Sequence, residues 1–505
     1  MNDFLRILLL NRRRGLKQSR TGILPVFYTG WKPVLRYIGS GRKAPPTVIL
    51  AICLFQTLGC APKKMSQATG LPNIVYIISD DQTYTDFGFM GHPVVQTPHL
   101  DHLAEQSAFF PNGYVTSSVC RPSLVTLLTG LYPFQHGVHF NHPPPGFPGL
   151  TQDPDLTKEE FDALRDKACD LIRNKPSLPR ILARNGYRCL QTGKYWEGHW
   201  SNAGFTEGMT IAEPSNALNG NKTIANGEVV AHGNGDAGLA IGRETMKPIF
   251  DFIDDCGEDQ PFMIWYAPFL PHVPHDSPQR FYDLYKGQNI PDHKLPYYAS
   301  ISWFDETVNQ LIKAIEDRDL ADNTLFVFVV DNGFEPDPKN PRNYTKNSKR
   351  SPFEPGLRTP MMLRWDGVLS PAKFEELVSS IDLFPTILEA AGVKDEIESP
   401  GISLLPSALG KSKLDPNRAV FGDIYPGDAS VLGNPAADIA YRWVRQGDYK
   451  LIVPSLPDAW GDYLTKPGLF NVVTDPLEEK DLSRTSEYRD RFTQLHTLID
   501  EWWSP

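Results

Sequence analysis

Two pairs of oxygen-bearing side chains, Asp80-Asp81 and Asp331-Asn332, each follow directly after a short run of apolar residues. Carboxylate and amide oxygens are hard ligands, which suit Ca2+ or Mg2+ better than zinc. Either pair by itself would also be typical of a turn or a helix cap. Because both pairs end an apolar run and neither has a basic neighbour, we expect a metal site, with calcium as the ion and magnesium as the alternative.

A cysteine motif, Ser117-Ser-Val-Cys-Arg-Pro-Ser-Leu-Val-Thr-Leu-Leu-Thr-Gly130, is the third candidate for chemistry. Pro122 and Ser123 can open a helix that Gly130 ends, which would place Cys120 at the helix N-terminus. Free N–H groups and the helix dipole favour an anion at that position. A lone cysteine is often a small buried hydrophobe, but the residues around Cys120 favour a reactive role.

The elements that must position these residues are predicted by apolar runs without alternation, which indicate a parallel sheet buried on both faces. Ligands bind at the carboxyl ends of such strands, so the two acidic pairs can reach one site although they are far apart in the sequence. We therefore expect an α/β domain. Its expected strands cover residues 73–79, 187–191, 261–267, 324–330 and 360–363, and its expected helices cover residues 100–108, 123–128, 177–184, 299–315 and 383–391.

After residues 399–401 the sequence changes to short strand-like segments separated by turns, which predicts a second, smaller α+β domain. A chain of 505 residues also exceeds the size at which one hydrophobic core stops growing. We expect the catalytic domain at residues 72–400 and the C-terminal domain at residues 401–505. The expected elements of the latter are short strands at residues 440–445, 449–453 and 468–471 and a final helix at residues 488–503.

The N-terminal segment, residues 1–60, is typical of a leader and export signal. Basic residues precede an uncharged apolar stretch that ends in Leu58-Gly59-Cys60 and is shorter than the roughly 20 residues of a membrane span. The sequence Leu58-Gly59-Cys60 resembles the signal cleavage site of a bacterial lipoprotein, although Thr57 stands where an aliphatic residue is usual. We expect export to the periplasm or cell envelope, with a lipid anchor at Cys60 as the contact with a membrane; the alternative, a buried helix, does not suit the basic and Pro-rich flanks.

Charge and cysteine content limit the function classes. Without residues 1–59 the chain has 40 basic and 59 acidic side chains and a net charge of about −19, and no basic stripe follows downstream, so nucleic acid is not an expected partner. An anionic substrate must be held by a local basic pocket. Cys120, Cys169, Cys189 and Cys256 are too few and too widely spaced for a disulfide scaffold or a cysteine-based zinc site.

Together these motifs resemble the formylglycine-dependent (type I) sulfatases of the alkaline phosphatase superfamily, whose signature is Cys-x-Pro-Ser-Arg followed by Thr-Gly. The resemblance covers nearly the whole chain after residue 72 and implies a large mixed, mostly parallel sheet flanked by helices. It rests on Asp80-Asp81, Gln96-Thr-Pro-His-Leu-Asp-His, the Cys120 motif, Gly193-Lys194, Pro271-His272, Asp331-Asn332-Gly333, Lys349 with Glu354-Pro-Gly-Leu-Arg-Thr-Pro, Asp382-Leu-Phe-Pro-Thr386, Gly468-Leu-Phe-Asn471 and Asp475-Pro-Leu-Glu-Glu.

The resemblance also implies a mechanism and a role for each matching residue. A maturation enzyme would oxidise Cys120 to formylglycine, whose hydrate attacks sulfur and afterwards expels sulfate. Lys194 and Lys349 would grip the sulfate oxygens, although a lysine alone is usually solvated surface, and His272 would assist the leaving oxygen or bind sulfate. The metal ligands would be Asp80, Asp81, Asp331, Asn332 and the modified Cys120.

Two positions depart from the family pattern. Leu124 stands where Cys-x-Pro-Ser-Arg has its arginine, and Trp196 stands where Gly-Lys-x-His has its histidine. We expect His199 to substitute for that histidine if the loop bends, and Arg121 to replace part of the missing positive charge.

We therefore expect a sulfatase that acts on a sulfated carbohydrate. The pocket walls are expected from the loops at residues 139–148, 196–205 and 216–236, whose Trp, His and Asn content suits sugar recognition. A phosphoester or phosphonate hydrolase of the same superfamily is one alternative. A degenerate lipoprotein that binds sulfated glycans without cleaving them is the other, and Leu124 and Trp196 are the features that favour it.

Overall fold

The computed structural model describes residues 70–505, apart from residues 258, 395–397, 426, 456–460 and 462. The described residues belong to one compact unit. The expected leader and the lipidation site at Cys60 lie outside the described residues, so both stay predictions. Among the described helices, none is both long and apolar enough to cross a membrane.

A nine-stranded sheet forms the centre of this unit, in the order β12-β2-β11-β8-β1-β7-β3-β4 with β13 beside β2. β1 runs parallel to β7 and β8, and β3 runs parallel to β7, whereas β11 is antiparallel to both β8 and β2. The mixed, mostly parallel sheet is therefore confirmed. The strands are β1 (Asn73–Ser79), β2 (Ala108–Tyr114), β3 (Arg188–Gly193), β4 (Glu207–Gly208), β7 (Phe262–Ala267), β8 (Thr324–Val330), β11 (Arg358–Trp365), β12 (Ala372–Lys373) and β13 (Val378–Ser379).

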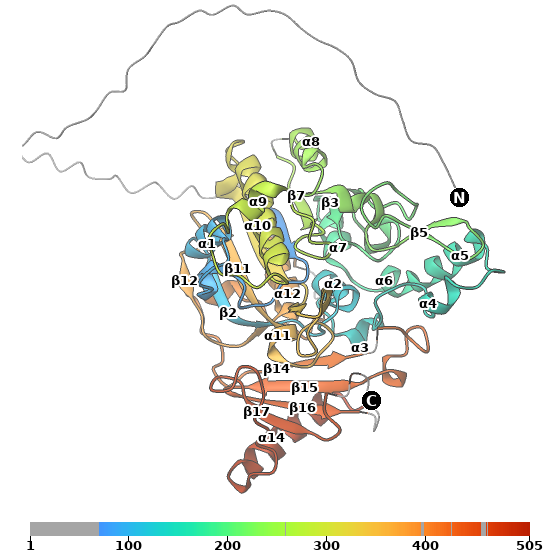
Figure 1. Ribbon diagram of the computed structural model, residues 1–505. Helices are drawn as coiled ribbons and strands as arrows, with labels where there is room; N and C mark the ends of the chain where they lie inside the picture. The colour runs from blue at the N-terminus through green and yellow to red at the C-terminus, as the bar shows by residue number, and fades with distance from the viewer. Residues whose placement is uncertain (1–69, 258, 395–397, 426, 456–460, 462) are drawn as a thin grey trace, which may run out of the picture. The chain divides into compact units, whose positions relative to one another are not determined.

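Both faces of this sheet are covered, which explains why its central strands read as unbroken apolar runs. Along β1 the side chains alternate between two cores: Ile74, Tyr76 and Ile78 enter one, and Val75 and Ile77 enter the other. Helices lie over both faces of the sheet (Figure 1) and pack onto these cores. The first face is covered by α2 (Cys120–Thr129), α7 (Leu178–Arg184) and α12 (Leu383–Ala390), and the second by α1 (Pro98–Glu105), α8 (Lys247–Asp255) and α10 (Leu295–Glu316).

A four-stranded antiparallel sheet, drawn in orange to red in Figure 1, forms the C-terminal part. One of its faces packs through Trp443 and Ile452 against Tyr114, at the end of β2, and Leu357, directly before β11. Its other face is covered by the final helix through Leu495 and related residues. The elements are β14 (Ala419–Ile424), β15 (Tyr441–Gln446), β16 (Tyr449–Pro454), β17 (Gly468–Asn471) and α14 (Arg489–Trp502).

The remaining elements are short and lie mostly in the connections. Among the helices these are α3 (Pro133–His136), α4 (Phe147–Leu150), α5 (Lys158–Ala168), α6 (Asp170–Arg173), α9 (Gln279–Asp283), α11 (Glu354–Leu357) and α13 (Leu405–Ala408), with 3-10 turns at Gly88–Met90, Trp200–Ala203, Asp236–Ala240, Ala321–Asn323, Ser380–Asp382, Pro435–Ala437 and Ser486–Tyr488. The two small hairpins are β5 (Asn221–Thr223) with β6 (Val229–Ala231) and β9 (Pro336–Asp337) with β10 (Asn340–Tyr344).

Candidate active site

The carboxyl ends of the central strands bring the two acidic pairs together. β1 and β8 are in register from Asn73 opposite Thr324 to Ser79 opposite Val330, so the next residues, Asp80 and Asp331, leave the sheet side by side. The Asp331 N–H donates to the Ser79 carbonyl at 2.9 Å, and the Asp81 N–H donates to Asp331 Oδ1 at 3.0 Å. Asp81 itself adopts a left-handed backbone, with φ 63°, an uncommon conformation that is enriched at functional sites.

The neighbouring strand ends complete this edge. β3 and β7 pair to the level of Gly193 opposite Ala267, which places Lys194 next to the acidic pairs. Gly193 has φ 72°, and a Cβ there would collide with the Ala267 carbonyl, so glycine is required for this turn. The chain after β7 continues to Leu270, whose carbonyl accepts from the Asp80 N–H at 3.1 Å, and then reaches His272.

Cys120 is the first residue of α2 and is fully buried. Its Sγ lies 3.8 Å from Asp81 Oδ1, 4.0 Å from Asp80 Oδ1 and 3.1 Å from Lys194 Nζ. Ligand atoms of Cys120, both aspartates and His272 all lie within 4.8 Å of one another. Burial raises the pKa of the Cys120 thiol to about 12, so the sulfur keeps its proton at neutral pH and is a weak nucleophile as a cysteine.

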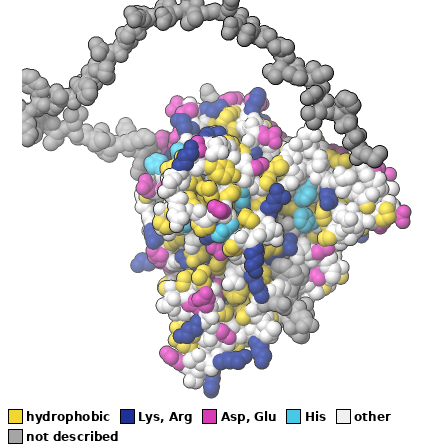
Figure 2. All heavy atoms as spheres, viewed as in Figure 1, with side chains coloured by type: hydrophobic (Ala, Val, Ile, Leu, Met, Phe, Trp, Pro, Cys, Tyr) yellow, Lys and Arg dark blue, Asp and Glu magenta, His cyan; other side chains and the backbone are white. Residues whose placement is uncertain are grey.

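Two buried lysines pair with the two aspartates. Lys194 Nζ donates to Asp80 Oδ1 at 2.6 Å, and Lys349 Nζ donates to Asp81 Oδ2 at 2.6 Å. Burial alone would lower the pKa of each ammonium, but the aspartates raise both pKa values above the usual range, so both lysines stay charged. Elsewhere on the face in Figure 2 acidic and basic side chains are interspersed. The two buried lysines are therefore local cationic groups, each paired with an aspartate of the site.

The carboxyl cluster fits a bound divalent cation. Oδ2 of Asp80, Oδ2 of Asp331 and Oδ1 of Asn332 are buried and have no hydrogen-bond donor among the described residues. Burial, with the charges of Asp331 and Asp81, raises the pKa of Asp80 well above the usual range, although Lys194 acts in the opposite direction. Buried oxygens without donors are costly unless a cation satisfies them, and an all-oxygen set suits a hard ion.

Asn332 holds the site from the β8 side. Its amide Nδ2 donates to Asp81 Oδ1 at 2.7 Å, and its backbone N–H donates to Asp331 Oδ1 at 2.6 Å. Gly333 follows, and a Cβ there would collide with the Pro355 carbonyl. The glycine in the Asp-Asn-Gly motif therefore allows this loop to lie against the segment that carries Lys349.

His272 faces both Asp81 and Lys349. Its Nε2 lies 3.2 Å from Asp81 Oδ2 and 3.5 Å from Lys349 Nζ, and its Nδ1 lies 2.7 Å from the Val273 carbonyl. Burial and the charge of Lys194 lower the pKa of His272 well below its usual value, so the imidazole is neutral. A neutral ring whose Nδ1–H donates to Val273 has its Nε2 lone pair directed to the site.

The segment that carries Lys349 is anchored to the C-terminal sheet by buried charges. Glu354, five residues after Lys349, accepts from Lys450 Nζ at 3.2 Å and from the Tyr114 hydroxyl at 2.5 Å. The Glu354 backbone N–H donates to Glu478 at 2.5 Å, and Glu478 lies 3.0 Å from the same lysine. Lys450 and Glu354 are fully buried, so this network fixes the position of the Lys349 segment.

A cavity of about 280 Å³ opens over Asp81, Lys194, His272 and Lys349. Its walls include residues from all three loops that the sequence indicated, namely 139–148, 196–205 and 216–236, which confirms that expectation. The wall residues from these loops are Asn141, His142, Trp196, Asn219, His232 and Asn234.

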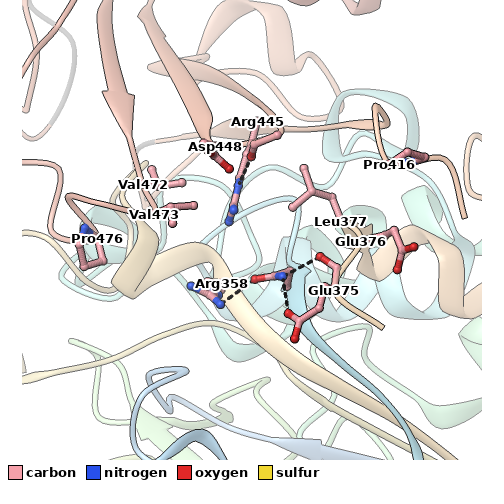
Figure 3. A pocket seen from close by; sticks show the side chains of 12 residues that line it. Arg358, Glu375, Glu376, Leu377, Pro416, Arg445, Asp448, Val472, Val473 and Pro476 are labelled. Atoms are coloured by element: carbon pink, nitrogen blue, oxygen red, sulfur yellow. Dashed lines mark hydrogen bonds between the residues drawn. The ribbon is translucent and has the colours of Figure 1, made fainter. Parts of the chain in front are cut away.

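A larger cavity, of about 590 Å³, lies elsewhere, between the large sheet and the C-terminal sheet (Figure 3). Its two arginines are already engaged: Arg358 donates to Asn112 Oδ1 at 2.7 Å, and Arg445 donates to the Gly447 carbonyl at 3.1 Å. None of the expected catalytic or metal-binding residues lines it. The smaller cavity is therefore the candidate active site.

The two proposed replacements for missing family residues do not reach this cavity. His199 is hydrogen-bonded to Ser201 at 2.8 Å and is not among the described residues that line the cavity. The Arg121 guanidinium is fully buried and pairs with Glu197 at 2.7 Å, so its charge is neutralised away from the cysteine. Leu124 packs into the apolar core with the rest of α2.

Besides His272, two further histidines line the cavity, His142 and His232, and sequence reasoning did not single them out. Both lie within the loops named as pocket walls, but no spacing relates them to Cys120 or to Trp196, and only the folded chain brings them together. The four described cysteines, Cys120, Cys169, Cys189 and Cys256, are all free.

Comparison with known proteins agrees with this geometry. Residues 72–393 match the sulfatase family model, and residues 343–503 match a model described as N-sulphoglucosamine sulphohydrolase, C-terminal. The chain is similar to arylsulfatase A of Bos taurus, 28% identical over 427 residues that make up 76% of this chain and 75% of that protein. It is also similar to N-acetylgalactosamine-6-sulfatase of Homo sapiens, 24% identical over 468 residues that make up 85% of each protein.

The fold is shared with solved structures. One, of a protein in complex with its substrate D-glucosamine-2-N,6-O-disulfate, has a TM-score of 0.64 at 17% identity and covers 85% of this chain and 97% of that one. The sheet and its flanking helices are thus the alkaline phosphatase-like fold. Within that class the chain belongs to the sulfatase family, because the family model matches more than half of it. The protein is a sulfuric ester hydrolase of a metal-dependent family.

Proposed function

We propose that the protein hydrolyses a sulfate ester of a carbohydrate, using formylglycine made from Cys120 and a calcium ion held by Asp80, Asp81, Asp331 and Asn332. The observation that carries this proposal is the position of Cys120, at a helix N-terminus between two carboxylates and the Lys194 ammonium. Magnesium is the alternative ion, since it prefers the same oxygen ligands.

Each absent group would supply one part of the chemistry. The hydrated aldehyde at position 120 supplies one hydroxyl to attack sulfur and a second whose deprotonation releases sulfate and restores the aldehyde. A calcium ion held by Asp80, Asp81, Asp331 and Asn332 would act as a Lewis acid that stabilises negative charge on an oxygen at position 120.

The chain's own residues orient the sulfate and handle the leaving group. Lys194 and Lys349 flank the cavity floor as charged donors, and they would hold the equatorial sulfate oxygens where negative charge develops. His272 faces the same space with a neutral imidazole whose Nε2 carries no proton, so it would take up a proton from the Lys349 ammonium, 3.5 Å away, and pass that proton to the ester oxygen as the S–O bond breaks. The alcohol leaves, and the sulfate that remains is released from position 120.

A carbohydrate is the proposed substrate class because of the similar proteins and the cavity walls. The human relative named above acts on an N-acetylgalactosamine sulfate and the solved structure holds a glucosamine sulfate, as their names state. The wall of this cavity supplies Trp, His and Asn side chains, which suit stacking and hydroxyl recognition. Export through residues 1–60, with lipid attachment at Cys60, would bring the enzyme to such substrates outside the cytoplasm.

Mass spectrometry of the peptide that contains Cys120 tests the modification, after co-expression with a formylglycine-generating enzyme. We expect an aldehyde in place of the thiol, together with hydrolysis of sulfated monosaccharides. Matched aryl sulfate and aryl phosphate esters distinguish a sulfatase from a phosphoester hydrolase by their relative rates. Conversion of Cys120 without turnover of any sulfate ester would contradict the hydrolase, and binding of sulfated monosaccharides would then test the alternative of a protein that only binds sulfated glycans.

A further inference from the structure

Three aromatic rings form one wall of the active-site cavity, and they contact one another. The Trp196 ring centre lies 5.1 Å from that of His142 and 5.9 Å from that of His232, and the two imidazoles are 5.5 Å apart. Phe147 stacks on His142 at 5.0 Å from the core side. These three residues, His142, Trp196 and His232, are called the ring wall below.

Each ring of the wall has a polar nitrogen that lacks a partner. Nδ1 of His142, Nε1 of Trp196 and Nδ1 of His232 are buried and make no hydrogen bond with any described residue. Trp196 is only 3% exposed. Buried nitrogens without a partner are costly, and these three belong to residues that line one cavity, so a ligand in that cavity is the candidate partner for them.

The electrostatics of the wall select the kind of ligand. Burial lowers the pKa of His142 to about 3, with a further contribution from His232 and nearby cations, and burial lowers the pKa of His232 to about 4. Both imidazoles are therefore neutral at pH 7, and each offers one N–H donor and one lone pair, whereas the indole offers a donor. A hydroxyl group can satisfy donors and acceptors alike, but a carboxylate or a second sulfate has no proton to give.

We propose that His142, Trp196 and His232 recognise the uncharged hydroxyl groups of the sugar ring beside the scissile sulfate. The inference rests on the proposed function, because the same cavity has Lys194, Lys349 and His272 at its floor. A cavity of about 280 Å³ is at the low end for ligand pockets, so it accommodates little more than one ring. The ring wall thus favours free hydroxyls on the part of the ring that faces it, whereas Arg342 and Arg350 line other parts of the cavity.

The first experiment varies the ligand and leaves the enzyme intact. Wild-type kcat/KM is measured first for N-acetylgalactosamine 6-sulfate and other monosulfated hexoses, and then for the deoxy analogues of the best of these substrates. D-glucosamine-2-N,6-O-disulfate and 4-nitrophenyl sulfate are measured for comparison. Loss of a recognised hydroxyl leaves buried nitrogens unpaired, so the deoxy analogue should lose about 10- to 100-fold in kcat/KM. Equal kcat/KM for the parent and all its deoxy analogues overturns the proposal.

The second experiment varies the wall. His142→Phe, His232→Phe and Trp196→Phe keep an aromatic ring but remove its nitrogen, and His102→Phe, at an exposed position on α1, is the matched control. Each wall variant should lose at least ten times more kcat/KM on the monosulfated hexose than on 4-nitrophenyl sulfate, about the effect of one buried hydrogen bond. Equal losses on both substrates, or no loss on either, contradict the proposal, and thermal unfolding midpoints identify a variant that is misfolded.

Failure of the proposed function gives a different result from failure of the ring wall. Absence of wild-type turnover on every sulfate ester refutes the hydrolase, and binding of the monosulfated hexose and its deoxy analogue, measured by titration calorimetry, then tests the wall. Weaker binding of the deoxy analogue supports the wall in that case, and equal binding overturns it.

Discussion

Lys194 Nζ lies 3.1 Å from Cys120 Sγ and 2.6 Å from Asp80 Oδ1, although the three residues come from different parts of the fold. One ammonium thus contacts both the residue proposed to attack sulfur and a proposed metal ligand. A charge in this position can lower the energy of an anion that forms between them, because it is buried and needs no reorganisation.

Replacing either active-site lysine should therefore impair catalysis more than folding. We expect Lys194→Met and Lys349→Met to lower kcat/KM for a sulfate ester by about 10²- to 10³-fold, the usual effect of removing one transition-state donor. Steady-state kinetics with 4-nitrophenyl sulfate measures this. Lys247→Met is the control, since Lys247 is exposed on α8; equal activity in all three variants would exclude the assigned roles.

Removal of the metal should change stability as well as activity. A chelator such as EGTA should abolish turnover and lower the unfolding midpoint, because the buried carboxylates would repel one another, and added Ca2+ should restore both. At a free Ca2+ concentration 100 times the dissociation constant the gain in stability is about 2.7 kcal/mol. Asp331→Ala should abolish the rise in unfolding midpoint that Ca2+ causes. Asp153→Ala, in an exposed loop, should show the same rise as the wild type. A midpoint unaffected by calcium in the wild type would refute the site.

The two candidate histidines should differ in effect. His272→Ala should lower kcat by about 10²-fold or more, as expected for a group that transfers a proton. His199→Ala should stay close to wild type, because the structure places His199 against Ser201 and away from the cavity. The pH profile of kcat for both variants checks this, and a large loss confined to His199→Ala would restore the role that the sequence suggested for it.

The buried Arg121–Glu197 pair should matter for stability. Glu197→Ala leaves a fully buried guanidinium without its counter-charge, which costs about 3–5 kcal/mol. Denaturant unfolding of the variant measures the loss. Glu207→Ala is the matched control, since Glu207 pairs with Arg188 at a partly exposed position. Similar midpoints for the two variants would contradict the expectation.

Asp423 should make the protein less stable as the pH rises. Burial raises the pKa of Asp423 to about 7, so between its unfolded pKa and pH 7 the folded chain binds a proton that the unfolded chain has released. Stability is therefore greatest at low pH in this window and falls as the pH rises, by up to about 4 kcal/mol.

Asp423→Asn tests this, because Oδ2 accepts from both the Tyr425 hydroxyl and the Phe134 N–H, and an amide oxygen can do the same. The free energy of unfolding, measured from pH 5 to pH 8, should decline less steeply in this variant than in the wild type. Parallel curves for the two proteins would show that Asp423 does not titrate in this range. Asp490→Asn, at an exposed position, should follow the wild type.

The strands and the acidic cluster were predictable because their signals are local. Apolar runs fixed β1 and β8 to the residue, and helix α2 was found from Pro122 and Gly130, although it begins three residues earlier than expected, at Cys120 itself. β2, which pairs with β11, was missed because Pro111 and Gly113 lie within it, and both residue types are disfavoured in strands. The ring wall was missed as a unit because its three members meet only through long-range packing.

Lys450 of the C-terminal sheet binds the buried Glu354 carboxylate of the segment that carries Lys349, and Glu478 accepts from the Glu354 backbone N–H. Expression of residues 72–400 alone would leave that carboxylate without its ammonium and expose the apolar surface around Tyr114. The two parts therefore cannot be separated as independent modules. Domain exchange in engineering therefore has to keep Glu354, Lys450 and Glu478 together, because these residues hold the segment that carries Lys349 in place.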